Sequence, residues 1–183
     1  MLSLQPEELN TAAAVFADGF ADDPAFSLAL DGEIKGKTLL YQYFLNYISA
    51  CKELLLYKYS EAGEGYLCLY RHDTSFSDFA VPQPLMQMEE FQCIDRYYSR
   101  DFAVLDIMAV APQCRGKGIA GQMIDFFVEY CRREGLLAIV EVFSDAHLQL
   151  YYAHGFTVAH RRHHRGITTY ILEYSNDSDN KGN

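Results

Sequence analysis

Basic residues are scarce in this 183-residue chain, which has 15 Lys and Arg against 25 Asp and Glu and a formal net charge of −10. A dedicated nucleic-acid-binding protein needs a basic surface that displaces counterions, so this composition argues against a nucleic-acid partner. No stretch of the sequence approaches the roughly 18–20 unbroken apolar residues of a membrane span. The first eight residues lack the basic and apolar segments of a signal peptide. We therefore expect a cytoplasmic protein with no membrane partner.

Cysteine is also sparse, and the five residues at positions 51, 68, 93, 114 and 131 form no Cys-x-x-Cys pair. An odd number at wide spacing fits neither a disulfide framework nor a zinc knot, so we expect reduced thiols and no metal. Half of the residues are hydrophobic and 22% are charged, which excludes wholesale disorder. The length allows one domain, which we place at residues 1–174, followed by a polar, disordered tail at 175–183.

Apolar periodicity predicts both helices and strands. Helical spacing predicts helices over 6–20, 38–52, 118–134 and 146–154, and another that begins at Pro84 and carries Leu85, Met88, Phe91 and Tyr98. Strand signals fall at 54–59, 65–71, 102–110, 137–143, 156–160 and 167–174. The strand at 137–143 is apolar enough to be buried on both faces, and residues 72–83 have the character of a loop. This order predicts one mixed α/β (α+β) layer structure without repeats or linkers.

The strongest functional signal is a glycine-containing loop between a strand and a helix, Val110 to Ala120, with the sequence VAPQCRGKGIA. Glycines let backbone amides approach an anion closely, and the N-terminus of the following helix adds about half a positive charge. Arg115 and Lys117 add cationic charge in an otherwise acidic chain. A pyrophosphate is therefore the ligand that we expect at this loop.

Two common phosphate-binding motifs fit this loop poorly. The Gly-x-x-x-x-Gly-Lys-[Ser/Thr] pattern of P-loop nucleotidases is absent. Gly116, Gly118 and Gly121 match the dinucleotide fingerprint, and Glu141 lies where a ribose-binding acid would fall. However, five residues separate Val110 from Gly116, and the 67 residues after Gly116 are too few for the rest of a dinucleotide-binding sheet. A structural turn without a ligand is the remaining alternative.

Two segments together resemble a known family. Residues 113–120, QCRGKGIA, resemble the coenzyme A pyrophosphate loop of the GNAT superfamily of acyl-CoA-dependent N-acyltransferases. Residues 150–156, LYYAHGF, are similar to the Tyr-x-x-x-Gly-Phe motif of that family and follow in the right order. The resemblance covers about 102–174 and implies a central mixed, mostly antiparallel sheet flanked by helices on both faces. More weakly, residues 15–26 and 140–142 resemble the puromycin N-acetyltransferase-like branch, although 67–76 lacks the tryptophan-and-proline strand end common there.

The resemblance implies direct transfer of an acetyl group from acetyl-CoA, as co-substrate, to a primary amine of a small molecule. It implies that the pyrophosphate binds backbone amides of Arg115, Gly116, Lys117, Gly118, Ile119 and Ala120. It further implies that the pantetheine pairs with the main chain of Met108, Ala109 and Val110. Where many members have a pantetheine-binding Asn, this chain has Ser144 and His147 at the two common positions. Alternatives are a non-catalytic acyl-CoA-binding module and an enzyme acting on a protein amine, and the sequence leaves open whether the chain forms a homodimer.

Acetyl transfer needs a proton donor and a base. Tyr151 matches the family's tyrosine and would protonate the departing thiolate, although it could equally be a packed aromatic. Glu141, in an apolar strand, is our candidate base, because burial would raise its pKa toward a useful value. Asp106 is the rival, and a relay of waters is the third alternative.

Several other features invite a functional interpretation. The run from His160 to Arg165, HRRHHR, could be a metal or nucleic-acid patch, but we expect a solvated hairpin between the two last strands. Cys114 lies beside the cationic loop but has no adjacent base, which disfavours a cysteine nucleophile. The aromatic residues of the first half should lie mostly in the core, with some lining the acceptor pocket: Tyr41, Tyr43, Phe44, Tyr47, Tyr57, Tyr59, Tyr66 and Tyr70.

Overall fold

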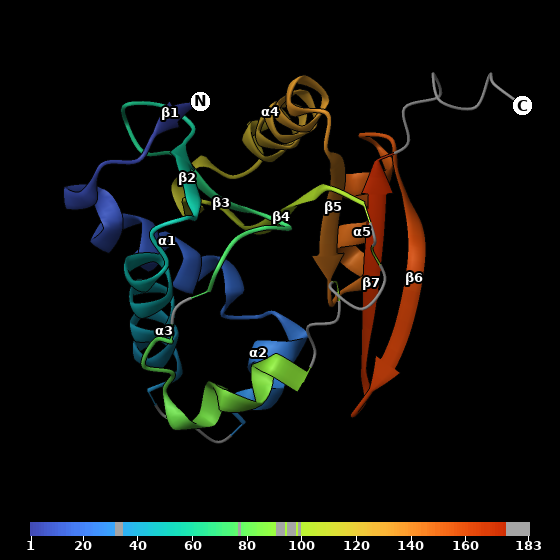
Figure 1. Ribbon diagram of the computed structural model, residues 1–183. Coiled ribbons are helices and arrows are strands. Elements are labelled where there is room, and N and C mark those ends of the chain that lie inside the picture. Colours follow the sequence, from blue (N-terminus) through green and yellow to red (C-terminus); the bar gives the residue numbers. More distant parts are fainter. Residues whose placement is uncertain (32–34, 77, 91–93, 95–97, 99, 175–183) are drawn as a thin grey trace, which may run out of the picture.

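A computed structural model describes residues 1–31, 35–76, 78–90, 94, 98 and 100–174, with the backbone alone described at 87–90 (Figure 1). The expected tail at 175–183 and the expected helical residue Phe91 lie outside the described residues. None of the helices in the described part is long and apolar enough to cross a bilayer.

In the described part of the chain, seven strands form one sheet. Their order across the sheet is β1 (Leu2–Ser3), β2 (Leu55–Lys58), β3 (Gly65–Arg71), β4 (Phe102–Val110), β5 (Leu137–Val142), β7 (Ile167–Tyr174) and β6 (Phe156–His164). Neighbouring strands are antiparallel, except that β4 and β5 are parallel. The expectation of a mixed, mostly antiparallel sheet is therefore confirmed.

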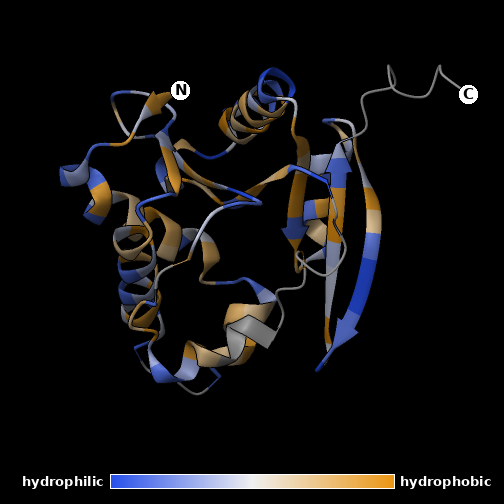
Figure 2. Ribbon diagram, in the orientation of Figure 1, coloured by the Kyte–Doolittle hydropathy of each residue, from blue (hydrophilic) through white to orange (hydrophobic). Residues whose placement is uncertain are grey.

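Helices cover both faces of the sheet, as expected (Figure 1). One face carries α1 (Leu9–Phe20), α2 (Pro24–Ala29) and α3 (Gly36–Ala50), whose apolar side chains share a core with Cys68 and Ile107. The other face carries α4 (Ile119–Glu134) and α5 (Asp145–Tyr152), which share a second core with Leu67 and Leu105. Short 3₁₀ turns lie between these elements, among them η1 (Pro6–Glu8), η2 (Gln83–Glu90) and η4 (Pro112–Cys114). The central strand β5 is mostly buried and hydrophobic, as its sequence predicts (Figure 2).

The helix α2 is an element that the periodicity did not predict. Its N-cap is Asp23, whose Oδ1 accepts hydrogen bonds from the backbone amides of Ala25 (3.0 Å) and Phe26 (3.3 Å). Pro24 occupies the first turn, where its missing N–H costs nothing. The Asp23-Pro24 pair, which follows the helix expected over 6–20, is thus the start of a second helix. At six residues, α2 is too short to show a 3.6-residue period.

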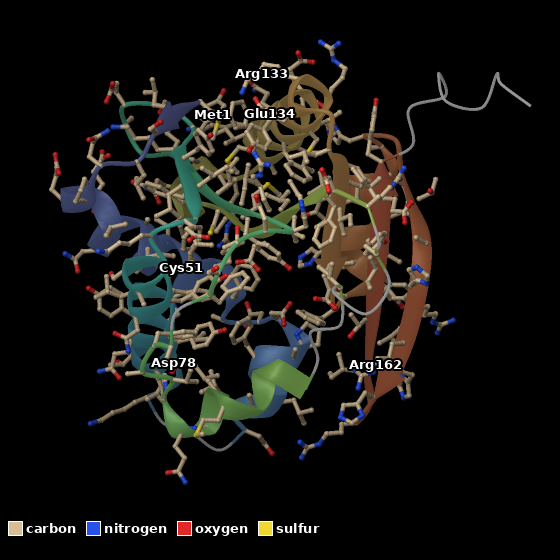
Figure 3. All side chains as sticks on the ribbon, in the orientation of Figure 1. Met1, Cys51, Asp78, Arg133, Glu134 and Arg162 are labelled. Carbon is tan, nitrogen blue, oxygen red and sulfur yellow. The ribbon has the colours of Figure 1, made fainter. Side chains whose placement is uncertain are left out.

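Residues 160–165 form a hairpin between the last two strands, as expected, but the strand that was expected to end at His160 continues to His164 as β6. The register pairs His164 with Ile167, so the turn is confined to Arg165 and Gly166, with φ angles of 49° and 82°. Positive φ at both central residues is what a tight hairpin turn requires. The second half of β6 is hydrophilic (Figure 2), and Arg162 lies toward the outer end of this hairpin (Figure 3).

Over residues 83–90, the segment expected to be a helix from Pro84 is not α-helical. The described part is the 3₁₀ segment η2, which begins at Gln83 and contains the fully buried Leu85. Tyr98 lies outside any helix.

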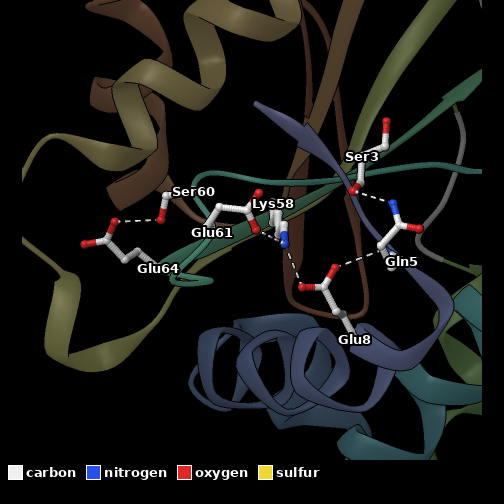
Figure 4. A network of polar contacts seen from close by, with 7 residues as sticks. All are labelled: Ser3, Gln5, Glu8, Lys58, Ser60, Glu61 and Glu64. Atoms are coloured by element: carbon white, nitrogen blue, oxygen red, sulfur yellow. Dashed lines mark hydrogen bonds and ion pairs between the residues drawn. The ribbon is translucent and has the colours of Figure 1, made fainter.

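Lys58 connects the N-terminal segment to the sheet (Figure 4). Its side chain is 8% exposed, and its Nζ lies 2.8 Å from Oε1 of Glu8 and 2.8 Å from Oε2 of Glu61. Hydrogen bonds to Glu61 and Glu8 raise the pKa of Lys58. The bond from Lys58, followed by that from the Gln5 amide, lowers the pKa of Glu8. The contact of Lys58 with Glu8 is therefore strongest when both groups are charged.

We expect Lys58→Met to lower the melting temperature at neutral pH. The lowered pKa of Glu8 gives a contribution that is complete above the ordinary Glu pKa and lost as pH falls through the folded-state value. The difference from wild type should therefore shrink in acid, as measured by thermal unfolding across a pH series. Lys37→Met is the control, because Lys37 pairs with Asp18 while 71% of its side chain is exposed. Equal losses in the two variants would show that the buried ion pair adds no more stability than the exposed one.

Candidate active site

Strands β4 and β5 separate at the centre of the sheet. Their parallel pairing covers Phe102–Leu105 and Leu137–Val140. On the other side of β4, Leu105 pairs with Leu69 and Ile107 pairs with Cys68, which leaves Asp106 as the extra residue of a β-bulge. Beyond the bulge, a cavity of about 370 Å³ lies between the two strands. We call it the large cavity; its lining includes Asp106, Met108, Ala109, Val110, Arg115, Ala120, Glu141, His147 and Tyr151.

One end of the large cavity is formed by the glycine loop. The turn η4 leads from β4 into the loop, and α4 begins at Ile119 after Gly118. Arg115 lies across this end: its Nε donates to the Val110 carbonyl (3.3 Å), and its Nη2 donates to the Asp18 carbonyl (3.4 Å). The cationic side chain is thereby held beside the N-terminus of a 16-residue helix. This end can bind an anion.

The other end of the large cavity is formed by α5. Tyr151 is 6% exposed and packs edge-to-face on Phe156, with ring centroids 5.7 Å apart. Burial raises the pKa of Tyr151, so its phenol stays protonated at neutral pH. His147 is exposed and also lines the cavity. Ser144 instead caps α5, because its Oγ accepts a hydrogen bond from the Ala146 amide at 3.2 Å.

A second, smaller cavity of about 60 Å³ adjoins the first. Seven of its described lining residues are aromatic, and we call it the aromatic cavity: Phe20, Phe26, Tyr43, Phe44, Tyr47, Tyr70 and Phe143. Asp106 and Glu141 line both cavities, so the two carboxylates stand where the cavities meet. Val140 and Val142 belong to the core beneath α4, which places Glu141 on the opposite face of β5.

The carboxylate of Asp106 is hydrogen-bonded to a side chain of α3. The Tyr47 hydroxyl donates to Oδ2 of Asp106 at 2.7 Å. Burial raises the pKa of Asp106 to about 6, against the opposing effect of the Tyr47 hydrogen bond. Burial, and then the charge of Asp106, raise the pKa of Tyr47, so the phenol remains the donor of this bond. The pKa of Asp106 therefore lies closer to neutral pH than that of an exposed aspartate.

The structure brings together most of the predicted site residues. Met108, Ala109, Val110, Arg115, Ala120, Glu141, His147 and Tyr151 line the large cavity. Gly116, Lys117 and Gly118 form the adjoining loop, whereas Ile119 is buried in the core beneath α4 and Ser144 is engaged as a cap. The run from His160 to Arg165 lies on β6 and its turn and contributes nothing to the described lining of either cavity.

The aromatic residues divide between the cavity and the rest of the fold. Tyr43, Phe44, Tyr47 and Tyr70 line the aromatic cavity, whereas Tyr41, Tyr57, Tyr59 and Tyr66 lie elsewhere. Phe20, Phe26 and Phe143 also line it, although the sequence did not mark them as cavity residues. Phe26 is on the unpredicted helix α2, and Phe143 follows the last residue of β5. No periodic signal distinguishes such positions from the rest of the core.

The third glycine of the dinucleotide fingerprint has a packing role. A Cβ at Gly121 would lie 2.9 Å from Nε2 of His154, whose Nδ1 is 2.7 Å from Oδ1 of Asp125. Gly121 thus allows His154, two residues after α5, to approach α4 closely. The cysteines at 51, 68, 114 and 131 are buried free thiols. Within the described ranges, no group of three His, Cys, Asp or Glu side chains is arranged to hold a metal ion.

Comparison with known proteins identifies similar folds. Residues 87–158 match the family model described as an acetyltransferase (GNAT) domain. The structure of a histone acetyltransferase HPA2 and related acetyltransferase from Corynebacterium glutamicum ATCC 13032 aligns with a TM-score of 0.69 and 17% identity over 94% of this chain and 93% of that one. An N-acetyltransferase from Staphylococcus aureus Mu50 aligns with a TM-score of 0.65 and 15% identity over 94% and 98% of the respective chains.

A further match is the ribosomal-protein-S18-alanine N-acetyltransferase from Escherichia coli, with a TM-score of 0.57 and 15% identity over 99% of this chain and 97% of that one. A search of curated protein sequences gave no match. At these identities the structural comparisons show the fold, and the names of the neighbours cover more than one kind of acceptor.

Proposed function

We propose that this chain, which has the GNAT acetyltransferase fold, transfers an acetyl group from acetyl-CoA to the primary amine of a small molecule. The observation that carries the proposal is the separation of β4 from β5 over the large cavity. That cavity reaches from the cationic glycine loop to a buried tyrosine and two carboxylates. A long ligand with an anionic end and a reactive end fits this arrangement.

In this proposal, the pyrophosphate of coenzyme A binds the backbone amides of Arg115–Ala120 at the start of α4. The pantetheine lies along Met108, Ala109 and Val110, whose edge faces the large cavity. His147 lines the same cavity and can donate or accept a hydrogen bond there. The thioester would then lie near Tyr151, Asp106 and Glu141, where the two cavities meet.

The chemistry requires two proton movements. An amine with a pKa of about 10 arrives as an ammonium ion, which has no lone pair for attack. Glu141, our candidate base, takes one proton, and the amine nitrogen forms a bond to the thioester carbon. The C–S bond then breaks, a second proton leaves the nitrogen, and the thiolate gains a proton with help from Tyr151. The products are an amide, the free thiol of coenzyme A and one released proton.

The residues that act in this proposed reaction come from opposite faces of the sheet. Glu141 and Asp106 adjoin the aromatic cavity on the face covered by α1, α2 and α3. Tyr151 comes from the core on the other face, beneath α4 and α5. An amine approaching from the aromatic cavity would thus meet the carbonyl on one side, with the proton donor for sulfur on the other.

The resemblance of residues 15–26 and 140–142 supports placement in the puromycin N-acetyltransferase-like branch.

The direct test mixes the purified protein with acetyl-CoA and a panel of amines, amino acids and peptides, and follows release of free thiol. We expect thiol release with a small primary amine. Binding of acetyl-CoA without thiol release over any amine would favour a non-catalytic binding module. A preference for peptides would favour a protein acceptor, and failure to bind acetyl-CoA would overturn the proposal.

A glycine variant tests the pyrophosphate loop separately. Gly118 has a φ of 76° and an open space where a Cβ would stand, so Gly118→Ala costs about 1–2 kcal/mol of backbone strain. We expect this strain to displace the amides and weaken acetyl-CoA binding roughly tenfold or more, measured by calorimetric titration. Gly135→Ala is the matched control, because Gly135 ends the same helix with a φ of 69° and equally open space. Equal affinity in the two variants would contradict a role of the loop in binding.

A further inference from the structure

The lining of the aromatic cavity suits a ligand that carries a positive charge on an apolar group. Two of its described lining residues can carry a charge, and both, Asp106 and Glu141, are carboxylic acids. The remainder is largely aromatic, and ring faces attract cations as well as apolar groups. A second charge on the same ligand, placed away from these two carboxylates, would have to lose its water among the aromatic and aliphatic side chains of the described lining.

Ring contacts hold this cavity in shape. Phe26 packs edge-to-face on Tyr43 with centroids 5.7 Å apart, and Tyr43 stacks on Tyr47 with centroids 6.3 Å apart. Phe20 contacts both Phe26 (5.6 Å) and Phe44 (5.3 Å). Helices α1, α2 and α3 supply these packed rings, and most of the remaining described lining comes from β3, β4 and β5. Such a preformed pocket selects by size and polarity.

Tyr47 has a second function beyond packing, because its hydroxyl holds Asp106. The bond of 2.7 Å orients the carboxylate at the junction of the two cavities. It also favours the ionised form of Asp106 against the effect of burial. Among the described residues, the titratable or charged groups around this carboxylate come from both cavities and from β3. They are Tyr43, Tyr47, Tyr70 and Glu141 in the aromatic cavity, Asp23, Arg115, His147 and Tyr151 in the large cavity, and Cys68 on β3.

We propose that the aromatic cavity selects a compact apolar monoamine, held as its ammonium ion by Asp106, and that Tyr47 is the residue that positions Asp106 for this contact. This inference rests on the proposed acetyl transfer and narrows its acceptor. A polyamine or a lysine side chain in a peptide carries further charge or backbone that the cavity excludes. The preferred acceptor instead has one amino group on a short alkyl chain, because this cavity of about 60 Å³ is well below the roughly 150 Å³ of a cavity that binds benzene.

The test compares kcat/KM for propylamine and isobutylamine with that for spermidine and a lysine-containing peptide, at saturating acetyl-CoA. We expect the two monoamines to exceed the other acceptors roughly tenfold or more. Tyr47→Phe keeps the ring and removes the hydroxyl, so the KM for the monoamine should rise while kcat changes little. The acidic limb of kcat/KM should also move to higher pH, because the carboxylate loses the hydrogen bond that favours its ionised form.

Tyr41→Phe is the matched control, since Tyr41 is on the same helix and donates to Oδ1 of Asn10 at 2.9 Å, away from both cavities. Identical pH profiles in the two variants, or a preference for spermidine or the peptide, would overturn this inference while leaving acetyl transfer intact. Calorimetric binding of isobutylamine but not of spermidine, without any thiol release, would instead uphold the cavity's selectivity and overturn the transfer reaction. Absence of both binding and release would overturn the two together.

Discussion

Replacing Tyr151 by phenylalanine should lower turnover roughly tenfold or more, with little change in the affinity for acetyl-CoA. The change removes one hydroxyl and keeps the ring, so the edge-to-face packing on Phe156 persists. Burial raises the pKa of Tyr151 further above that of a thiol, which is about 8.5. Complete proton transfer is therefore uphill, and the phenol stabilises the departing thiolate chiefly as a hydrogen-bond donor. The measurement is steady-state thiol release together with equilibrium binding of acetyl-CoA.

The neighbouring Tyr152 provides the control for this experiment. It is on the same turn of α5 but is 41% exposed and does not line either cavity. Tyr152→Phe should therefore leave both turnover and affinity near wild type. If Tyr151→Phe also turned over normally, Tyr151 would be a packed aromatic and the thiolate would take its proton from another source.

The strands and long helices could be predicted because their signals are local. Helix α4 begins and ends at glycines and has a clear apolar stripe, and β5 is an almost unbroken apolar run. By contrast, β1 has two residues and exists because Leu2 and Ser3 pair with Lys58 and Tyr57. The extension of β6 to His164 likewise depends on pairing with β7. Polar residues at a sheet edge carry no hydrophobic period, so their strand state comes from register alone.

The residues of the candidate site likewise fall into those with a local sequence signal and those that only the tertiary structure brings together. The glycine loop and Tyr151 were found because each belongs to a short contiguous motif. The role of Tyr47 could not be found, because an i, i+3, i+4 pattern marks it only as a core residue of α3. Its contact with Asp106 spans 59 positions of the chain. The bulge that frees Asp106 from regular pairing is a property of two strands together, and neither strand shows it in sequence.

Exchanging each carboxylate for its amide should separate the base from the residue that binds the ammonium ion. If Glu141 takes the proton, Glu141→Gln should lower kcat roughly 10²-fold or more and remove the acidic limb of its pH profile. Asp106→Asn should mainly raise the KM for the amine, since a neutral amide no longer pairs with the ammonium ion. The limb in kcat should survive in this variant, because the base is still present.

The rival assignment predicts the opposite result. Burial raises the pKa of Asp106 to about 6, which is close to the range in which a general base is effective at neutral pH. If Asp106 is the base, Asp106→Asn should remove the limb near pH 6 and Glu141→Gln should change KM alone. Steady-state rates over a pH series, with acetyl-CoA saturating, distinguish the two. If both variants kept the acidic limb in kcat, neither carboxylate would be the base, and a relay of waters would have to carry the proton from the amine.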